Sequence, residues 1–297
     1  MSKAGTYYIG RVLKLGVLNQ ETLIEAIKTP STIYHRGNAW TFIDVEEFKD
    51  NEVHYIFGRL SKFSPSGEIT KIDIEKHSEI TQSEPNLSVA SSNFVYIPEH
   101  SGIAFLNVYN HIEQHTFTKR FSEIINEKYD NFFVDNKIEM VTDLRTFATK
   151  LASLDGIYKI SAKVSPPNPL FGPLWKPLKE YLAKRNTDTM QIIEDAPESE
   201  PLNTDLTKYV KAISEQTPDS QYVPLEELPI GDSAILMAAD GYGNGTIKGK
   251  QNGEIITIKT SETKKHFTFE KNPTPYDLYS KAIGIFRSIQ NERHMRH

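Results

Sequence analysis

The side chains best placed to do chemistry in this 297-residue chain are five lysines near its C-terminal end. They are Lys248, Lys250, Lys259, Lys264 and Lys265. A lysine ammonium can neutralise a phosphate and release its counterions, which gives an affinity that depends on salt and not on base sequence. Residues of the same parity share one face of a strand, so Lys248 and Lys250 point to one side. We therefore predict a nucleic-acid-binding surface here. The alternative is a sheet edge whose lysines prevent pairing with another chain.

The charge distribution favours a nucleic-acid-binding surface confined to one part of the protein over one that covers the whole protein. Residues 240–297 contain 10 Lys+Arg and 6 Asp+Glu, whereas residues 1–239 contain 24 and 33, within a net charge of −5. An acidic chain of this kind does not coat a polyanion over its whole surface. Any contact with nucleic acid would be confined to the basic patch.

Other possible sites have simpler structural explanations. The run Asp240-Gly-Tyr-Gly-Asn-Gly245 looks like a phosphate-binding loop, but such loops lead into a helix and this one leads into a predicted strand. His111 and His115 have a spacing that can share a metal, but Ile112 occupies the position where the zinc-protease pattern has Glu. We predict a turn for the first and a surface or capping pair for the second.

No catalytic residue, metal site or cofactor is predicted. Asp240 and Glu254 could be imagined in a nuclease, but the acidic-x-Lys spacing that places both groups on one strand face is missing. Trp40 and Trp175 lie in apolar contexts, which predicts core positions and not base stacking.

The composition places the protein in a reducing compartment. The chain has no Cys, which excludes disulfides, thiolate metal sites and a cysteine nucleophile. It has neither an N-terminal signal pattern nor an apolar run of the ~20 residues that a membrane span needs. We predict a cytoplasmic protein with no membrane span.

Hydrophobic periodicity predicts the elements that position these residues. Runs rich in β-branched and aromatic residues predict strands at 6–13, 39–45, 53–62, 68–74, 93–97, 103–108, 132–141, 157–164, 190–193, 233–240, 245–251 and 254–260. Apolar residues at helical spacing, with capping residues, predict helices at 20–28, 116–127, 144–154, 173–185, 206–213 and 275–290. Turns are predicted at 64–67, 244–245 and 252–253, and an exposed loop at 77–91. The first turn is predicted to close a hairpin between the strands at 53–62 and 68–74.

This order of elements predicts an α+β fold with two domains and mixed, mostly antiparallel sheets that carry flanking helices. Residues 194–205 begin with acidic residues and prolines, which predicts an acidic linker or a surface loop. As a linker, this segment would separate an α+β domain, residues 1–193, from a basic β-meander with a C-terminal helix, residues 206–297.

Several segments resemble, in the same order, the RexA-like phage-exclusion proteins. The resemblance covers about residues 90–290 and contains no catalytic signature. The segments are Ser92-Asn-Phe-Val-Tyr96, Ser101-Gly-Ile-Ala-Phe105, Gly156-Ile-Tyr-Lys-Ile-Ser-Ala-Lys-Val164, Asn168-Pro-Leu-Phe-Gly172, Ala238-Ala-Asp240, the hairpin ending at Thr260, and a final helix with Tyr279 and Arg287. The resemblance implies a bacterial or prophage defence protein that binds DNA without strong sequence preference. It also implies a homodimer that acts with an effector protein.

The sequence thus predicts a non-enzymatic component of a phage-defence (abortive-infection) system that binds double-stranded DNA through the five lysines. Two alternatives remain. One is a protein-interaction scaffold that senses a phage or host protein, which would require an exposed apolar patch. The other is a metal-dependent nuclease, which would require acidic side chains that converge in a pocket.

Overall fold

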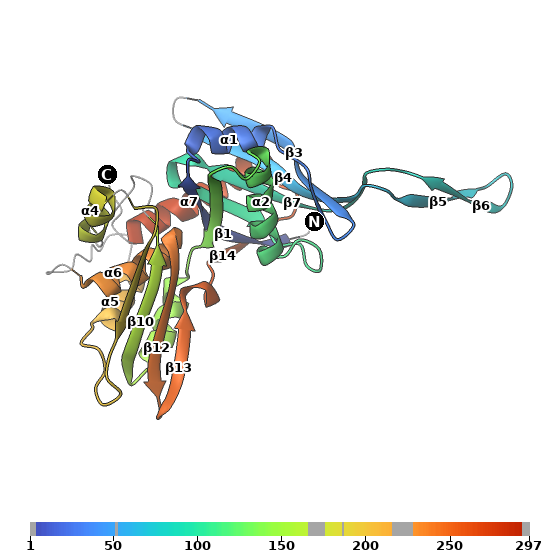
Figure 1. The fold of residues 1–297 in the computed structure, drawn as a ribbon. Helices are drawn as coiled ribbons and strands as arrows, with labels where there is room; N and C mark the ends of the chain where they lie inside the picture. Colours follow the sequence, from blue (N-terminus) through green and yellow to red (C-terminus); the bar gives the residue numbers. More distant parts are fainter. Residues whose placement is uncertain (1–3, 51–52, 166–175, 186, 216–227, 293–297) are drawn as a thin grey trace.

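The computed structural model describes residues 4–50, 53–165, 176–185, 187–215 and 228–292. Two lobes, each built on one sheet, make up the body of the protein, and a long hairpin projects from the first lobe (Figure 1). The proline-rich connector predicted at 166–169 and the Asn168–Gly172 part of the resemblance lie outside the described residues.

The first lobe is organised around its longest strand. Residues 7–11 of β1 pair with β8, while residues 4–8 pair with β14 and residues 10–16 with β9 along the opposite edge. The sheet order is β14-β1-β8-β7-β4-β3-β2. The strands are β1 (Ala4–Gly16), β2 (Ile33–His35), β3 (Asn38–Lys49), β4 (His54–Ser64), β7 (Leu87–Ile97), β8 (Gly102–Leu106), β9 (Val134–Met140) and β14 (His266–Glu270).

Helices cover both faces of this sheet, so its central strands are buried on both sides. Helices α1 (Gln20–Lys28) and α2 (Gln114–Lys128) pack on one face, where the rings of Phe105 and Phe117 stack with centroids 4.0 Å apart. Helix α7 (Pro275–Glu292) packs on the other, where Tyr55 and Tyr279 stack at 4.2 Å. Alternation along β4 and β7 sends successive apolar side chains to opposite faces.

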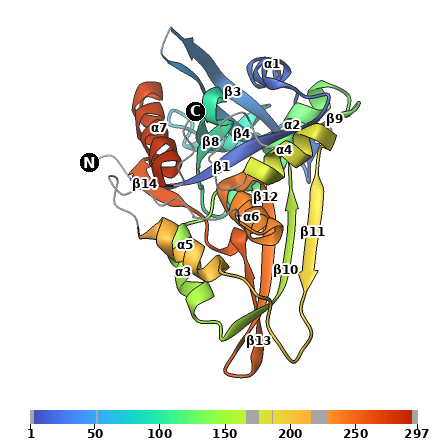
Figure 2. The same cartoon turned by 90° about the vertical axis from the view of Figure 1, so that its left-hand side faces the viewer.

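The second lobe is a four-stranded sheet with one face covered by helices. Its order is β11-β10-β12-β13, from β10 (Gly156–Val164), β11 (Met190–Asp195), β12 (Gly243–Gln251) and β13 (Glu254–Lys259). Helices α3 (Leu144–Ala152), α5 (Leu206–Ser214) and α6 (Ile230–Met237) lie on one side of it (Figure 2), and α4 (Lys176–Arg185) contacts α6. A Cβ at Gly245 would lie 2.8 Å from Cδ1 of Ile235, so glycine lets α6 approach β12 closely.

The predicted fold class is confirmed. The fold is α+β, every strand pairing in the described residues is antiparallel, and each large sheet with its helices forms one lobe. The domain boundary predicted at 194–205 stays a prediction. Strands from both sides of that segment pair in each sheet, β10 with β12 and β1 with β14, so a division there would separate both sheets.

The predicted hairpin around residues 64–67 is wrong, and so is the predicted loop at 77–91. Strand β4 pairs with β7, and β5 (Glu68–Asp73) pairs instead with β6 (Ser78–Ser83) to form the projecting arm in Figure 1. A turn signal is local, whereas the partner of β4 is decided by burial: β7 brings Phe94 and Tyr96 into the core, and β5 has no buried side chain.

Two further predictions concern glycine-rich or apolar runs. The strand predicted at 233–240 is wrong, because these residues form α6 and part of the helical turn η3 (Ala238–Tyr242). The segment is buried on all sides, and a fully buried apolar run has no hydrophobic period that distinguishes a helix from a strand. The turn predicted at 244–245 is also wrong, because both residues lie within β12. The turn at Asn252-Gly253 is confirmed, with φ of 51° and 84°.

The predicted helices at 20–28 and 116–127 are confirmed, each within a residue or two. The first begins at a capping box: the side chain of Asn19 accepts a hydrogen bond from the backbone N–H of Thr22 at 3.0 Å, and the hydroxyl of Thr22 accepts one from the N–H of Asn19. Among the described residues, no helix is both long enough and apolar enough to cross a membrane.

A buried arginine connects the two lobes. The side chain of Arg11 on β1 is 1% exposed; its Nε donates to the carbonyl of Asp240 at 2.7 Å and its Nη1 donates to the carbonyl of His100 at 2.6 Å. The guanidinium carbon also lies 4.7 Å from the ring centroid of Tyr242 and 5.6 Å from that of Phe286 on α7. Because η3 leads from α6 into β12, Arg11 fixes the start of the second sheet against the first.

We expect Arg11→Met to lower the free energy of unfolding by about 3–5 kcal/mol, because two buried carbonyls lose charged donors. Urea unfolding followed by circular dichroism measures this change. The control is Arg59→Met, since Arg59 is partly exposed and pairs with Asp44 at the surface, where such a pair contributes about 1 kcal/mol or less. Equal losses in the two variants would contradict the role given to Arg11.

Candidate nucleic-acid interface

The face of the four-stranded sheet turned away from the helices carries lysines and short polar side chains, together with Asp195 and the exposed Ile193 and Ile255. Ile160, Ile247 and Ile258 are neighbours across β10, β12 and β13, and all three are buried toward the helices. By strand alternation, the residues on either side of them point outward. We call this outward surface the lysine face; it comprises Lys159, Ser161, Lys163, Thr246, Lys248 and Lys259.

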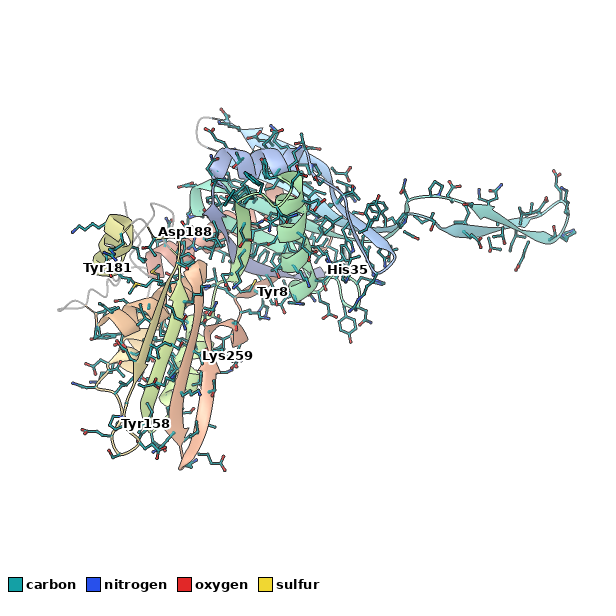
Figure 3. All side chains as sticks on the ribbon, viewed as in Figure 1. Tyr8, His35, Tyr158, Tyr181, Asp188 and Lys259 are labelled. Atoms are coloured by element: carbon teal, nitrogen blue, oxygen red, sulfur yellow. The ribbon has the colours of Figure 1, made fainter. Side chains whose placement is uncertain are left out.

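The strand register brings these residues together. Thr246 has Ser161 as its Cα partner on β10 and Lys259 on β13, while Lys248 lies opposite Lys159. Lys163 lies opposite Asn244, one outward position further along. Neighbouring strands are ~4.8 Å apart, so the lysines of this face lie within about two strand spacings of the hydroxyls of Ser161 and Thr246. Lys259 and Tyr158 are labelled on this lobe in Figure 3.

Most of the charge on the lysine face is available to a ligand. Lys159 forms an ion pair with Asp195 at 2.6 Å. Among the described residues, the side chains of Lys163, Lys248 and Lys259 have no hydrogen-bond or ion-pair partner. Their ammonium groups remain hydrated and can exchange water for phosphate oxygens.

The five predicted lysines fall into separate groups. Lys248 and Lys259 belong to the lysine face, whereas Lys250 lies toward the far end of the sheet, where its Nζ donates to the carbonyl of Glu198 at 3.0 Å and lies 4.3 Å from the ring centroid of Tyr158. Lys264 and Lys265 lie beside the first lobe. The Nζ of Lys264 donates to Gln114 on α2 at 2.6 Å, and the backbone N–H of Lys265 donates to the carbonyl of Val141 at 2.7 Å.

Lys159 and Lys163 were missed because they lie far from the other lysines in the sequence. Their same-parity spacing in the strand 156–164 is the signal that could have placed both on one face. The sequence does not indicate that this strand pairs with β12, since the two are separated by more than a helix and a strand.

The other candidate groups do not converge on a reactive site. Asp240 is buried in η3, whereas Glu254 is exposed at the start of β13. Trp40 is buried, as predicted. Within the described ranges, no three His, Cys, Asp or Glu side chains lie close enough to hold a metal ion.

A buried carboxyl lies on the covered side of the same sheet. Asp232, in the first turn of α6, is 1% exposed, and both of its oxygens accept from the hydroxyl of Thr204 at 2.6 and 2.8 Å. Burial raises the pKa of Asp232 from 3.8 to about 6; the Thr204 hydrogen bond opposes this rise, and the charges of Glu194 and Asp205 add to it. The proton is therefore held more tightly in the folded state.

The fold and the site define an α+β protein with one open, basic sheet face. The chain belongs to the family described as "Domain of unknown function (DUF4747)", which matches residues 21–216. The match includes Lys159 and Lys163 of the lysine face and ends before β12 and β13. No curated protein matches this chain.

We expect Asp232→Asn to raise the free energy of unfolding at pH 7.5 by about 1–2 kcal/mol, because the amide still accepts from Thr204 and no charge is buried. A raised carboxyl pKa means that the stability contributed by protonated Asp232 is complete below pH 3.8 and is lost as the pH rises through about 6. Denaturant unfolding at pH 4.5, 6.0 and 7.5 should therefore show that the free energy of unfolding declines less with rising pH in the variant than in the wild-type protein. Asp188→Asn, at an exposed position, is the control. A uniform loss at all three pH values would contradict this account.

Proposed function

We propose that this protein binds double-stranded DNA through the lysine face, without reading the base sequence, as a component of a bacterial or prophage phage-defence (abortive-infection) system. The observation that supports DNA binding is the cluster of Lys163, Lys248 and Lys259 on an open sheet face, with no protein partner among the described residues. No catalytic residue is part of the proposal.

The chemistry of the lysine face suits phosphate contact better than base recognition. Each ammonium neutralises one phosphate, and the hydroxyls of Ser161 and Thr246 between them can donate to phosphate oxygens. Base readout by hydrogen bonding uses Arg, Asn or Gln side chains that reach into a groove, and a flat face of lysines and hydroxyls offers no bidentate group of this kind at its centre. The affinity would therefore depend steeply on salt.

The phage-defence setting is supported by the resemblance to RexA-like phage-exclusion proteins over about residues 90–290. The same resemblance supports a homodimer and an effector protein as partner. The absence of cysteine from the sequence supports a cytoplasmic location.

A second candidate function, a protein-interaction scaffold, is favoured by the β5–β6 arm. Ile72 and Ile74 near its tip are 75% and 78% exposed, and residues 68–83 carry four acidic residues and two lysines. A two-stranded hairpin of this kind is marginally stable by itself, and exposed isoleucines at its tip suit contact with another protein. In Figure 1 the arm projects away from both lobes, so it is sterically open to a partner.

The DNA-binding proposal is tested with a triple variant, Lys163→Gln/Lys248→Gln/Lys259→Gln. Fluorescence anisotropy with labelled duplex and single-stranded DNA, over a series from about 50 to 200 mM NaCl, gives the observed association constant. We expect weaker binding and a slope of log K against log [salt] that is reduced by about 2–3, since each lost phosphate contact removes about 0.9 on duplex DNA.

The matched control is Lys264→Gln/Lys265→Gln/Lys271→Gln, which also removes three charges, all outside the lysine face. It should leave the affinity and the slope nearly unchanged. Failure of the wild-type protein to bind at the lowest salt would overturn the proposal. An equal loss in both variants would show that the lysine face is not the surface involved.

The arm is tested with Ile72→Asp/Ile74→Asp. Both side chains are exposed, so we expect a change within about 0.5 kcal/mol in the free energy of unfolding. If the arm forms the proposed homodimer, sedimentation equilibrium should show a dimer for the wild-type protein and a monomer for the variant. Thr70→Asp/Gln82→Asp adds the same charge to the same arm and should leave the dimer intact. A variant that dimerises as tightly as the wild-type protein would contradict this role.

A further inference from the structure

A second basic site lies on the first lobe, away from the lysine face. A cavity of about 380 Å³ opens between α2, the β2–β3 hairpin and the end of β4. Of the ten described residues that line it, seven are Lys, Arg or His and none is acidic. Figure 3 labels one of them, His35, on the first lobe, whereas Lys259 and Tyr158 lie on the second. We call this cavity the basic pocket.

Four permanent cations contribute to the basic pocket: Arg36, Lys62, Lys119 and Arg120. Only Arg120 has an ion-pair partner among the described residues, Glu123, one turn further along α2. Lys62 and Arg120 each lie 5.6 Å from the ring centroid of Trp40. The local charge is thus about +3, on a protein whose net charge is −5.

The charge of the basic pocket also contributes to the pKa of a neighbouring histidine. Partial burial, and then the charges of Arg120 and Arg36, lower the pKa of His35, whereas the charge of Glu123 opposes this shift. The same charges that disfavour a proton on His35 favour an anion in the pocket. His111 and His115, which are four residues apart in the sequence, both line the pocket. Among the described residues, no group of side chains that could hold a metal ion is found.

Two hydrogen-bond donors in the lining have no partner. Trp40 is 3% exposed and Arg120 is 7% exposed, and neither the indole Nε1 of Trp40 nor the Nε of Arg120 has an acceptor among the described residues. Buried N–H groups without an acceptor are uncommon in folded proteins, because they have lost water and gained nothing in exchange. Both groups can only donate, and neither atom is exposed to solvent, so an oxygen acceptor of a ligand reaches them only when the lining side chains move.

We propose that the basic pocket binds a small ligand that carries two or more phosphate groups, such as pyrophosphate or the di- or triphosphate of a nucleotide. One phosphate contributes a charge of about −1.5 to −2. A single phosphate therefore leaves part of the +3 uncompensated, whereas two phosphates balance it. A cavity of this size also accommodates a ligand as large as a nucleotide. The proposal does not depend on DNA binding by the lysine face.

Trp40 provides a direct reporter of ligand binding. The chain has two tryptophans, Trp40 and Trp175, so Trp175→Phe leaves Trp40 as the single source of tryptophan fluorescence. In this background we expect a saturable change in fluorescence on titration with pyrophosphate or ATP, and a weaker response to inorganic phosphate. A 5′-monophosphorylated oligonucleotide is titrated in parallel, to distinguish a small polyphosphate from a nucleic-acid end.

The matched pair of variants tests the location of the site. Lys62→Gln/Lys119→Gln should weaken pyrophosphate binding at least about tenfold, because two charged donors are removed. Lys76→Gln/Lys128→Gln removes the same charge from the arm and from the end of α2, neither of which lines the pocket, and should leave the affinity unchanged. Equal melting temperatures without ligand confirm that each variant is folded.

Three results would overturn the proposal: no saturable response to pyrophosphate or ATP, equal affinity in the two double variants, or a response to the oligonucleotide alone. In the last case the pocket would belong to a nucleic-acid surface. A tenfold or greater loss confined to Lys62→Gln/Lys119→Gln would establish a polyphosphate site that is independent of the lysine face.

Discussion

The arrangement of the two lobes depends on the buried guanidinium of Arg11. A charged group can remain in the interior only if its donors are satisfied, and here backbone carbonyls of Asp240 and His100 accept them at 2.7 and 2.6 Å. The contact fixes β1, which pairs with β8, β9 and β14 in the first sheet, to η3, where the chain passes from α6 into β12. The aromatic rings of Tyr242 and Phe286 close the site around the guanidinium. The orientation of the second sheet, and with it the direction of its open face, therefore depends on this contact together with the hydrophobic core that the two lobes share.

The two faces of strand β12 have different roles: one packs against helices, and the other forms part of the lysine face. Gly245 and Gly249 face inward, where a side chain would meet Ile235 or Leu154, so α6 and the end of α3 can pack close to the sheet. The alternate positions face outward and carry Thr246 and Lys248. Close packing on one side holds the helices against the sheet, and strand pairing sets the register of the lysine face across three strands. The same strand thus positions the second lobe and supplies part of the candidate binding surface.

The protein is acidic overall, yet it gathers positive charge at two separate places. The lysine face is open, with charges carried on flexible stems, which suits the regular phosphates of a long polyanion. The basic pocket is concave and includes two arginines, which suits a compact anion with several oxygens. The acidic β5–β6 arm adds a third surface, with exposed isoleucines near its tip. The different shapes favour different partners for the three surfaces.

The sequence by itself determined the features that depend on neighbouring residues. The α+β class, the capping box at Asn19, the turn at Asn252-Gly253 and the outward placement of Lys248 follow from local spacing and backbone preferences. Tertiary structure alone decided which strands pair and which polar groups are buried. It placed β10 beside β12 and so brought Lys159 and Lys163 to Lys248 and Lys259, while Lys264 and Lys265 remained at the first lobe. It also buried Arg11, which in the sequence is one more polar residue of a strand. The physical reason is that long-range pairing and burial depend on contacts between residues far apart in the chain, and periodicity within a segment does not specify its partner.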